Sequence, residues 1–265
     1  ISYEHQLAIK WRQVRDALRR IGKLKDVPMR PIIPSPRQYA YRNRITVHAQ
    51  DGIIGFFRRD SHQLLDIENC PISQDEVNHA LAELRARSHV RDGHYALRAE
   101  VHRLLRRHLV PPNQGLLIDA YCGAGFFTKA LLNKFERVIG IDWDRFAIAA
   151  AKENATEKET YIAGDVEEVL IRNGGFLAGE VGSLRLGSRR SLTLIVDPPA
   201  AGLSPNVRRA IVELAPMTLI YISCNPPTLA RDLRELHDKF IIESVTPLDM
   251  FPQTAEIEVL VHLHA

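Results

Sequence analysis

Short apolar runs alternate with helical patterns from Leu116 to the C-terminus. Apolar strands are predicted at 116–121, 137–142, 160–163, 192–196 and 218–223, and each is followed by a helical stretch. The last two runs, 240–245 and 256–264, have no helix signal between them. Strand–helix alternation that closes with a strand pair predicts a doubly wound α/β domain. Its Rossmann-like sheet has seven strands, mostly parallel, with an antiparallel edge.

The first hundred residues follow another pattern. Residues 4–21 predict an amphipathic helix, with Leu7, Val14 and Leu18 on its apolar face and arginines mostly opposite. Four prolines between residues 28 and 36 predict an extended linker. Three short strands in residues 37–70 predict a small antiparallel sheet, and helices are predicted at 73–88, opened by a capping box at Ser73, and at 97–109.

This pattern suggests two domains. We expect residues 1–95 to form an N-terminal helix plus a small β-rich basic domain, and residues 96–265 to form the doubly wound domain. A Gly-, Ser- and Arg-rich stretch at 174–190 does not fit the strand–helix repeat and is predicted to be a surface insertion.

Charge is unevenly distributed, although the net charge is only +3. Residues 1–110 carry 20 Lys and Arg against 12 Asp and Glu (+8), whereas residues 111–265 carry 15 against 20 (−5). A basic front part favours a polyanion such as RNA over a merely solvated surface. We expect phosphate contacts from Arg42, Arg44, Arg58 and Arg59. The aromatic residues of the small sheet either stack on bases or form its core, and we expect the core for at least half of them.

Composition and cysteine content indicate the class of protein and its cellular compartment. The 265 residues are 45% hydrophobic and 25% charged, as in ordinary globular proteins, and no window reaches the roughly 18 consecutive apolar residues of a membrane span. Three widely spaced cysteines argue against a disulfide framework and a cysteine-only metal site. We expect a cytoplasmic monomer that binds neither membranes nor a metal ion.

The first strand of the doubly wound domain ends in a glycine turn, Asp119-Ala120-Tyr121-Cys122-Gly123-Ala124-Gly125. Such a turn lets a ligand approach the backbone at a helix N-terminus. Asp142 and Asp165 end the next two strands, and Asp165 is also expected to cap a helix. A further glycine of a dinucleotide-binding loop is absent near Thr128. Acids at successive strand ends favour a neutral or cationic nucleoside such as S-adenosylmethionine over NAD.

Two further strand ends carry candidate chemistry. The fourth strand ends in Asp197-Pro198-Pro199-Ala200; adenine-N6 methyltransferases have an aromatic residue where this chain has Ala200, which argues against that chemistry. The next strand ends in Ser223-Cys224-Asn225-Pro226-Pro227. A thiol at the carboxyl edge of a parallel sheet, ahead of a helix N-terminus, is either an activated nucleophile or a small buried residue. Position alone favours packing.

Four segments stand in the order and spacing of the RNA uracil-C5 methyltransferase family, which modifies uridines of transfer and ribosomal RNA. They are Asp119–Gly125, Asp197–Gly202, Ser223–Asp232 and Phe251–Glu258. The stretches Tyr41–Arg44 and Ile67–Pro71 also resemble its central RNA-binding domain. The chain is similar to a short form of the family, without the N-terminal β-barrel domain and iron–sulfur cysteines of longer members.

The resemblance implies a class I methyltransferase that moves a methyl group from S-adenosylmethionine to carbon 5 of a uridine in structured RNA. It implies that Cys224 is the nucleophile, adding to carbon 6, and that Glu258 is the base that removes the carbon-5 proton. The cofactor positions that it implies, with the two glycines of the turn, are Tyr121, Gly123, Gly125, Asp142, Asp165 and Asp197.

The chain departs from the family at Phe126, Ala200 and Glu256, where Asn, Arg and His are usual. A Phe-Gln-x-Asn stretch is expected near residue 100, where the chain has only Gly93–Arg98. These departures leave open two other functions: a catalytically silent RNA-binding protein that retains the fold, and a methyltransferase for another nucleobase.

Overall fold

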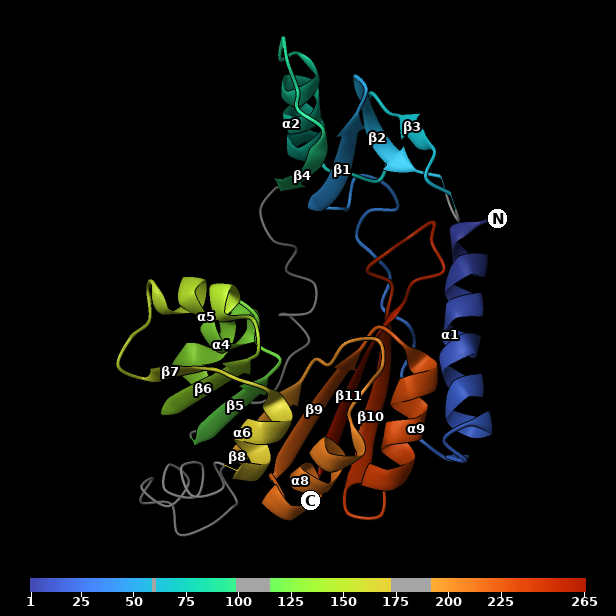
Figure 1. Ribbon diagram of the computed structural model, residues 1–265. Coiled ribbons are helices and arrows are strands. Elements are labelled where there is room, and N and C mark those ends of the chain that lie inside the picture. Colours follow the sequence, from blue (N-terminus) through green and yellow to red (C-terminus); the bar gives the residue numbers. More distant parts are fainter. Residues whose placement is uncertain (59–60, 99–114, 173–191) are drawn as a thin grey trace. The chain divides into compact units, whose positions relative to one another are not determined.

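The computed structural model describes residues 1–58, 61–98, 115–172 and 192–265 (Figure 1). The chain divides into two compact units. The smaller unit comprises Ile1–Gln6, Pro34–Arg107 and Met250–Glu256, and the larger comprises Leu7–Ile33, His108–Asp249 and Ile257–Ala265. The insertion expected at 174–190 and most of the helix expected at 97–109 lie outside the described residues. Residues 97 and 98, expected to begin that helix, end a strand instead.

The smaller unit contains a four-stranded antiparallel sheet in the order β3-β2-β1-β4. Its strands are β1 (Arg44–Gln50), β2 (Ile53–Phe57), β3 (Leu64–Asp66) and β4 (Gly93–Arg98). Asp51 and Gly52 join β1 to β2 with φ angles of 51° and 79°. A two-residue hairpin turn of type I′ requires two positive φ angles of this kind, which confirms the predicted turn.

Helix α2 (Asp75–Arg85) covers one face of this sheet, with Val77, Leu81 and Leu84 packed into a core that includes Ile45 and Val47. The capping box expected at Ser73 is wrong, because the helix begins later and Gln74 is its N-cap residue. The backbone of Ser73 instead pairs with that of Arg42 in an isolated bridge.

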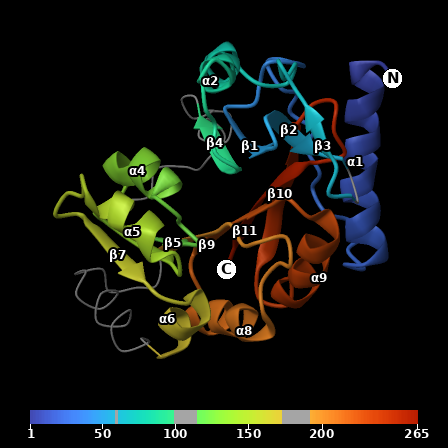
Figure 2. The same cartoon turned by 45° about the horizontal axis from the view of Figure 1, so that its top comes forward.

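The larger unit contains a seven-stranded sheet in the order β10-β11-β9-β8-β5-β6-β7 (Figures 1 and 2). Strands β5 to β9 are parallel, and β11 runs antiparallel to both β9 and β10. The strands are β5 (Leu116–Ala120), β6 (Arg137–Asp142), β7 (Glu159–Ala163), β8 (Leu192–Val196), β9 (Thr218–Ser223), β10 (Ile241–Leu248) and β11 (Glu258–His264). The predicted doubly wound sheet with an antiparallel edge is confirmed.

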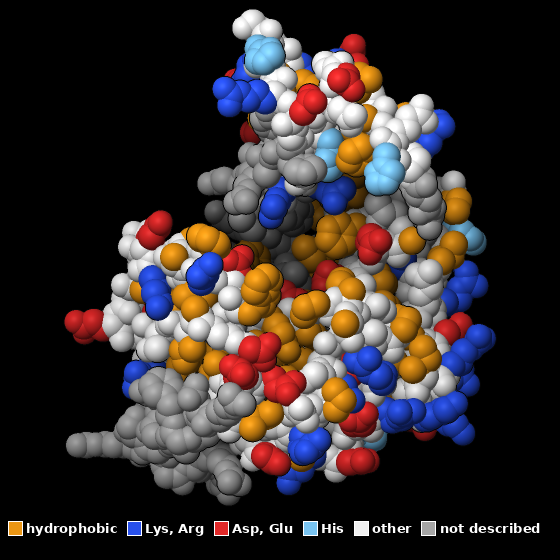
Figure 3. Space-filling view, in the orientation of Figure 1, with side chains coloured by type: hydrophobic (Ala, Val, Ile, Leu, Met, Phe, Trp, Pro, Cys, Tyr) orange, Lys and Arg blue, Asp and Glu red, His pale blue; other side chains and the backbone are white. Residues whose placement is uncertain are grey.

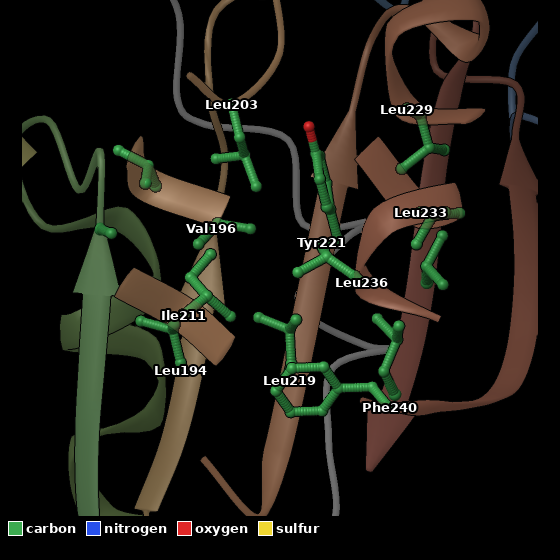
Figure 4. Packing of buried hydrophobic residues seen from close by; sticks show 14 of the residues in the cluster. Leu194, Val196, Leu203, Ile211, Leu219, Tyr221, Leu229, Leu233, Leu236 and Phe240 are labelled. Atoms are coloured by element: carbon green, nitrogen blue, oxygen red, sulfur yellow. The ribbon is translucent and has the colours of Figure 1, made fainter. Parts of the chain in front are cut away.

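Helices pack on both faces of this sheet. They are α1 (Tyr3–Arg20), α4 (Phe126–Leu131, extended by a 3-10 turn, Leu132–Lys134), α5 (Arg145–Lys152), α6 (Val166–Arg172), α8 (Pro205–Leu214) and α9 (Pro226–Leu236). Residues of α1, α6, α8 and α9 share one core with alternate residues of the strands. Figure 4 shows part of it, with Leu194 and Leu219 of the strands near Ile211 of α8 and Leu236 of α9. On the other face, Ile148 of α5 packs against Tyr161.

The N-terminal helix departs from the predicted division at residue 95. From Leu7 onward it belongs to the larger unit, because its apolar face (Val14, Ala17 and Leu18) is buried in that unit's core. Lys10 forms a buried salt bridge with Asp249, 2.6 Å from Nζ to Oδ1. No described helix is long and apolar enough to cross a membrane.

The proline-rich segment after α1 is extended, as predicted, and it also pairs with β10. Arg30 N donates to Val245 O (2.8 Å), Val245 N donates to Pro28 O (3.0 Å), and Ile33 N donates to Pro247 O (2.9 Å). Residues 28–33 therefore lie in parallel along the outer edge of the sheet.

Candidate active site

Five strands bring their carboxyl ends to one edge of the large sheet. Strands β5 to β9 are parallel, so the residues that follow them meet at this edge. The predicted site residues Tyr121, Asp142, Asp165, Asp197 and Cys224 all stand at or just after these strand ends. The topology thus gathers, within the larger unit, side chains that are up to about a hundred residues apart in sequence.

The turn after β5 has an unusual backbone. Tyr121, Gly123 and Gly125 have φ angles of 68°, 53° and 82°. A left-handed tyrosine is uncommon and costs about 1–2 kcal/mol, and such outliers concentrate at ligand sites. Gly125 is the N-cap residue of α4, which therefore begins directly at this edge.

Asp142 holds the turn from the neighbouring strand. Its Oδ2 accepts a hydrogen bond from Gly123 N (2.8 Å), and its Oδ1 accepts one from Asp144 N (2.9 Å). Each carboxylate oxygen has two lone pairs, so Asp142 retains acceptor capacity for a ligand hydroxyl. The same side chain thus fixes the glycine turn and remains able to accept from a ribose.

Asp165 caps helix α6, as predicted. Its Oδ1 accepts hydrogen bonds from Glu167 N (2.8 Å) and Glu168 N (3.3 Å). Burial, followed by the negative charges of Asp165 and Glu167, raises the pKa of Tyr121 to about 12. The phenol is therefore a neutral hydrogen-bond donor at physiological pH, close to an acidic strand end.

Asp197 is a perturbed acid among the predicted site residues. Burial raises its pKa from 3.8 to about 6. No hydrogen bond or salt bridge to its side chain is formed by the described residues. A partly buried carboxyl without such a partner has its acceptor capacity available to a ligand.

Asp119 lies one strand away and was given no role from sequence. Its side chain is fully buried; Oδ2 accepts from Thr128 N (3.1 Å), whereas Oδ1 has no hydrogen-bond partner among the described residues. Burial raises its pKa well above 3.8, with smaller contributions from Asp197 and Asp142. The sequence did carry a signal for Asp119, because it is an acid within a strand whose other residues are all apolar.

Cys224 follows β9 directly and is exposed, unlike Cys70 and Cys122. The turn after it is fixed by its neighbours: Asn225 N donates to Ser223 Oγ (3.1 Å), and that hydroxyl donates to Asn225 O (3.2 Å). Asn225 is the N-cap residue of α9, which starts with two prolines. The burial expected for a packing cysteine is therefore not found.

Glu258 lies beside Cys224 through strand register. Ser223 of β9 pairs with Val259 of antiparallel β11, so the next residues along, Cys224 and Glu258, stand at the same end of this strand pair. Glu258 is only 8% exposed and also pairs with Leu248 of β10. A carboxyl group and an exposed thiol thus meet at the edge that carries Asp197.

A buried network connects the strand before Cys224 to the helix after it. Asp232 of α9 accepts from Tyr221 Oη (2.7 Å), Leu203 N (2.8 Å) and Arg208 Nη1 (3.0 Å). Arg208 also donates to both carboxylate oxygens of Glu235, at 2.7 and 3.0 Å. Sequence reasoning quoted Asp232 without a role, although an acid among the apolar residues of α9 marks a buried polar position.

The loop after Asp197 is held through its main chain. Ala200 O accepts from Asn225 Nδ2 (2.9 Å) and Thr228 Oγ1 (3.0 Å), and Ala201 O accepts from Arg231 Nη2 (2.9 Å). These bonds do not depend on the side chain at residue 200. The loop is therefore tied to the Cys224 helix even though this chain lacks the arginine usual after Asp-Pro-Pro.

The smaller unit presents three of the four predicted RNA-binding arginines. Arg42, Arg44 and Arg58 are exposed, and Arg59 lies outside the described residues. The aromatics divide as expected: Tyr41 is buried and donates to Pro252 O (2.9 Å), and Phe56 packs on the core. Tyr39 and Phe57 are exposed.

Comparison with known proteins assigns the chain to a family. The sequence pattern of the family described as tRNA (Uracil-5-)-methyltransferase matches residues 107–265, more than half of the chain. The chain belongs to this family. The resemblance expected from the motifs is confirmed, and the protein is an RNA methyltransferase by family.

Two relatives match almost the entire chain. An uncharacterized RNA methyltransferase of Gloeobacter violaceus is 26% identical over 366 residues, covering 97% of this chain and 78% of the relative. Another, of Bdellovibrio bacteriovorus, is 28% identical over 306 residues, covering 99% and 75%.

A solved structure shows the same fold. The tRNA (uracil-54, C5)-methyltransferase of Pyrococcus abyssi, in complex with S-adenosyl-L-homocysteine, aligns with a TM-score of 0.66 and 22% identity. The alignment covers 99% of this chain and 84% of that chain. The predicted class I methyltransferase fold is confirmed, whereas the roles of individual site residues stay predictions.

Proposed function

We propose that the protein transfers a methyl group from S-adenosylmethionine to carbon 5 of a uridine in transfer or ribosomal RNA, through a covalent adduct on Cys224. The observation that carries the proposal is the register Ser223–Val259. With this register, the exposed thiol and the buried carboxyl of Glu258 belong to the sheet edge at which β8 ends with Asp197 next in sequence, and this supports the proposal. A nucleophile and a base on one edge are the two groups that this chemistry needs.

The turn after β5 suits the cofactor. A Cβ atom built on Gly123 would meet nothing within 4 Å, so the backbone there is open to a ligand. Asp142 beside it can accept from ribose hydroxyls, and the neutral phenol of Tyr121 borders the same turn. When bound, S-adenosylmethionine supplies an electrophilic methyl group.

The thiolate of Cys224 adds to carbon 6 of the uracil. The C6–S bond forms, the C5–C6 double bond is lost, and carbon 5 becomes the nucleophilic carbon of an enolate. The methyl group that carbon 5 takes would break from the cofactor's sulfonium sulfur, and neutral S-adenosylhomocysteine would leave. Carbon 5 then carries both the methyl group and its original proton. The sulfur remains bonded to carbon 6 until that proton is removed.

Glu258 acts as the base. Its carboxylate takes the carbon-5 proton, the C5–C6 double bond re-forms, and the C6–S bond breaks to return the thiolate. Asp197, with a pKa near 6, is mostly ionised at neutral pH and is then an acceptor for an N–H group of the uracil or cofactor. The net change is a methyl group in place of a proton.

The target base has to leave its stack to reach Cys224. Enzymes that act on a nucleobase either extrude it or use an unpaired one, at a cost of about a few kcal/mol. The exposed Arg42, Arg44 and Arg58 of the smaller unit supply phosphate contacts that offset this cost.

RNA containing 5-fluorouridine tests the nucleophile. Fluorine on carbon 5 cannot leave as a proton, so the adduct persists and is seen as a shifted band on a denaturing gel. We expect Cys224→Ala to form no adduct, whereas Glu258→Gln forms one. Cys70→Ala, which alters a buried cysteine, is the matched control and should react like the wild type. An adduct with Cys224→Ala would exclude Cys224 as the nucleophile.

The product identifies the reaction. Mass spectrometry of nucleosides from treated RNA should show 5-methyluridine. Methylation of another base would replace the proposal by a different base specificity. No methyl transfer to any RNA by the wild-type protein would favour the silent RNA-binding alternative.

A further inference from the structure

The outer face of α1 and the turn that follows it carry a row of cations. Arg12, Arg19, Arg20, Lys23 and Lys25 are all exposed, and we name them the α1 basic stripe. None of the five forms a salt bridge with another described residue. Figure 3 shows Lys and Arg side chains gathered along the edge that α1 occupies in Figure 1.

The α1 basic stripe differs in charge from the rest of the larger unit. Residues 7–33 carry eight Lys and Arg against two Asp, a balance of +6, whereas residues 111–265 have a balance of −5. An acidic body repels the phosphates of RNA, so a concentrated positive strip decides where a polyanion approaches it.

Helix stabilisation does not account for the stripe. Basic side chains in the last turn of a helix interact favourably with its dipole, which covers Arg19 and Arg20. Arg12 lies two turns earlier, and Lys23 and Lys25 follow the end of the helix. These three have no such role, and only Arg12 has a local bond, to Ala8 O at 3.3 Å.

The stripe is attached to the helix that follows Cys224. Gly22 lies so close to α9 that a Cβ atom there would stand 2.9 Å from Ala230 O. Lys23 follows with a left-handed φ of 58°, which turns the chain at this contact. The basic surface is therefore packed against α9, whose N-cap residue, Asn225, directly follows the thiol.

We infer that the α1 basic stripe is a second RNA-binding surface, which holds the backbone phosphates of the substrate RNA on the methyltransferase unit itself. The inference rests on the proposed function for the identity of the polyanion. Arginine and lysine side chains neutralise phosphates without reading sequence. The stripe therefore sets affinity and salt dependence, whereas base choice stays at the edge with Cys224.

Binding of an unmodified tRNA transcript to a fourfold variant tests this surface. The variant carries Arg12→Gln, Arg19→Gln, Arg20→Gln and Lys25→Gln; Lys23 is kept because its backbone is left-handed. We expect Kd to rise about tenfold or more, and the slope of log K against log salt to fall by about 3. KM for RNA rises, while kcat at saturating RNA and the affinity for S-adenosylhomocysteine stay unchanged.

A matched variant removes the same charge elsewhere on the larger unit: Lys134→Gln, Lys152→Gln, Lys158→Gln and Arg209→Gln. It should keep the wild-type Kd and salt slope. An equal loss of affinity in the two variants would overturn the inference, because net charge alone would then explain binding. An unchanged Kd in the stripe variant would overturn it too.

Chemical footprinting on the wild-type fold covers the case in which the stripe variant is unstable. Acetylation of lysines is compared with and without the transcript by mass spectrometry. RNA should protect Lys23 and Lys25 and leave Lys152 and Lys158 reactive. Equal reactivity of Lys23 and Lys25 in bound and unbound protein would refute the stripe. Binding and footprinting need no methyl transfer, so failure of the proposed chemistry is separately visible in the adduct assay.

Discussion

Tyr221 donates a hydrogen bond from its hydroxyl to Asp232 Oδ2 at 2.7 Å, joining the strand before Cys224 to the helix after it. Both residues are fully buried, and Asp232 also binds Arg208 and the backbone of Leu203. The thiol thus sits at the tip of a strand–turn–helix unit whose two arms are cross-linked by a polar network. Figure 4 shows Tyr221 among the apolar residues around this network.

Removing members of this network should have unequal effects. Tyr221→Phe deletes one donor and should lower the free energy of unfolding by about 1–2 kcal/mol. Asp232→Asn leaves the buried Arg208 without one of its counter-charges and should cost about 3 kcal/mol or more. Urea unfolding followed by circular dichroism measures both. Tyr39→Phe, at an exposed tyrosine, should match the wild type. Equal costs for Tyr221→Phe and Asp232→Asn would contradict the network.

Stability should depend on pH through Asp197. Its pKa is about 6 in the folded protein against 3.8 for an ordinary, solvated aspartate, so the folded state binds the proton more tightly than the unfolded chain does. The stabilisation by protonation is therefore full below pH 4 and is lost as pH rises to 6 and beyond. Asp197→Asn cannot ionise and should exceed the wild type by about 3 kcal/mol at pH 7, with no excess near pH 4. Urea unfolding across this range measures the difference, and an excess that does not change with pH would contradict the assignment.

The pair Lys10–Asp249 predicts a non-additive stability effect. Both side chains are buried, and Asp249 Oδ2 has no hydrogen-bond partner in the described part of the chain. Lys10→Met should lower the free energy of unfolding by about 3–5 kcal/mol because it leaves a buried carboxylate without its counter-charge. The double variant, Lys10→Met with Asp249→Leu, should recover most of the loss. A double-mutant cycle in urea measures the coupling. The exposed pair Arg15–Asp16 is the control, and Asp16→Asn should leave stability essentially unchanged.

Substitutions at two glycines distinguish the stability cost of a left-handed backbone from an effect on ligand binding. Gly123 and Gly52 both have positive φ, and a Cβ atom at either would meet nothing within 4 Å. Gly123→Ala and Gly52→Ala should therefore cost similar stability, about 1 kcal/mol. Only Gly123→Ala should weaken binding of S-adenosylhomocysteine, measured by calorimetry, because its new methyl group occupies the open side of the turn. Equal affinities in both variants would argue against the cofactor lying there.

The parts of the fold that follow local patterns could be predicted. Strand–helix alternation from Leu116 gives the large sheet, and Asp51-Gly52 gives the hairpin. Ser204 and Pro205 give the start of α8, where Ser204 Oγ accepts from Val207 N at 3.2 Å. Each of these features is fixed by residues that are neighbours in sequence, which is why the sequence carries them.

Placement of the N-terminal segment could not be predicted. The stripe of Val14 and Leu18 indicates a helix with a buried face, but it does not say which core receives that face. The partners of the segment, such as Asp249 and Val245, lie more than two hundred residues away. The Asp232 network has the same origin, because its members come from β9, α8 and α9.

The candidate site could be predicted from the sequence in part. The residue types and strand ends of Cys224, Asp142 and Asp197 are visible in the sequence. The proximity of Glu258 to Cys224 depends on the register of β11 against β9, which no local pattern specifies. The burial that perturbs Asp119 and Asp197 is likewise a property of the packed sheet.

Residues 28–33 have a consequence for solubility. Without them β10 would be the outermost strand, with a row of unsatisfied amides and carbonyls open to pairing with another molecule. The segment occupies that row. Pro28 and Arg30 face β10, whereas Pro31, which follows Arg30, has no N–H to offer a further strand on the outer side. Pro31 thus limits hydrogen-bonded growth of the sheet at the edge where intermolecular aggregation would otherwise begin.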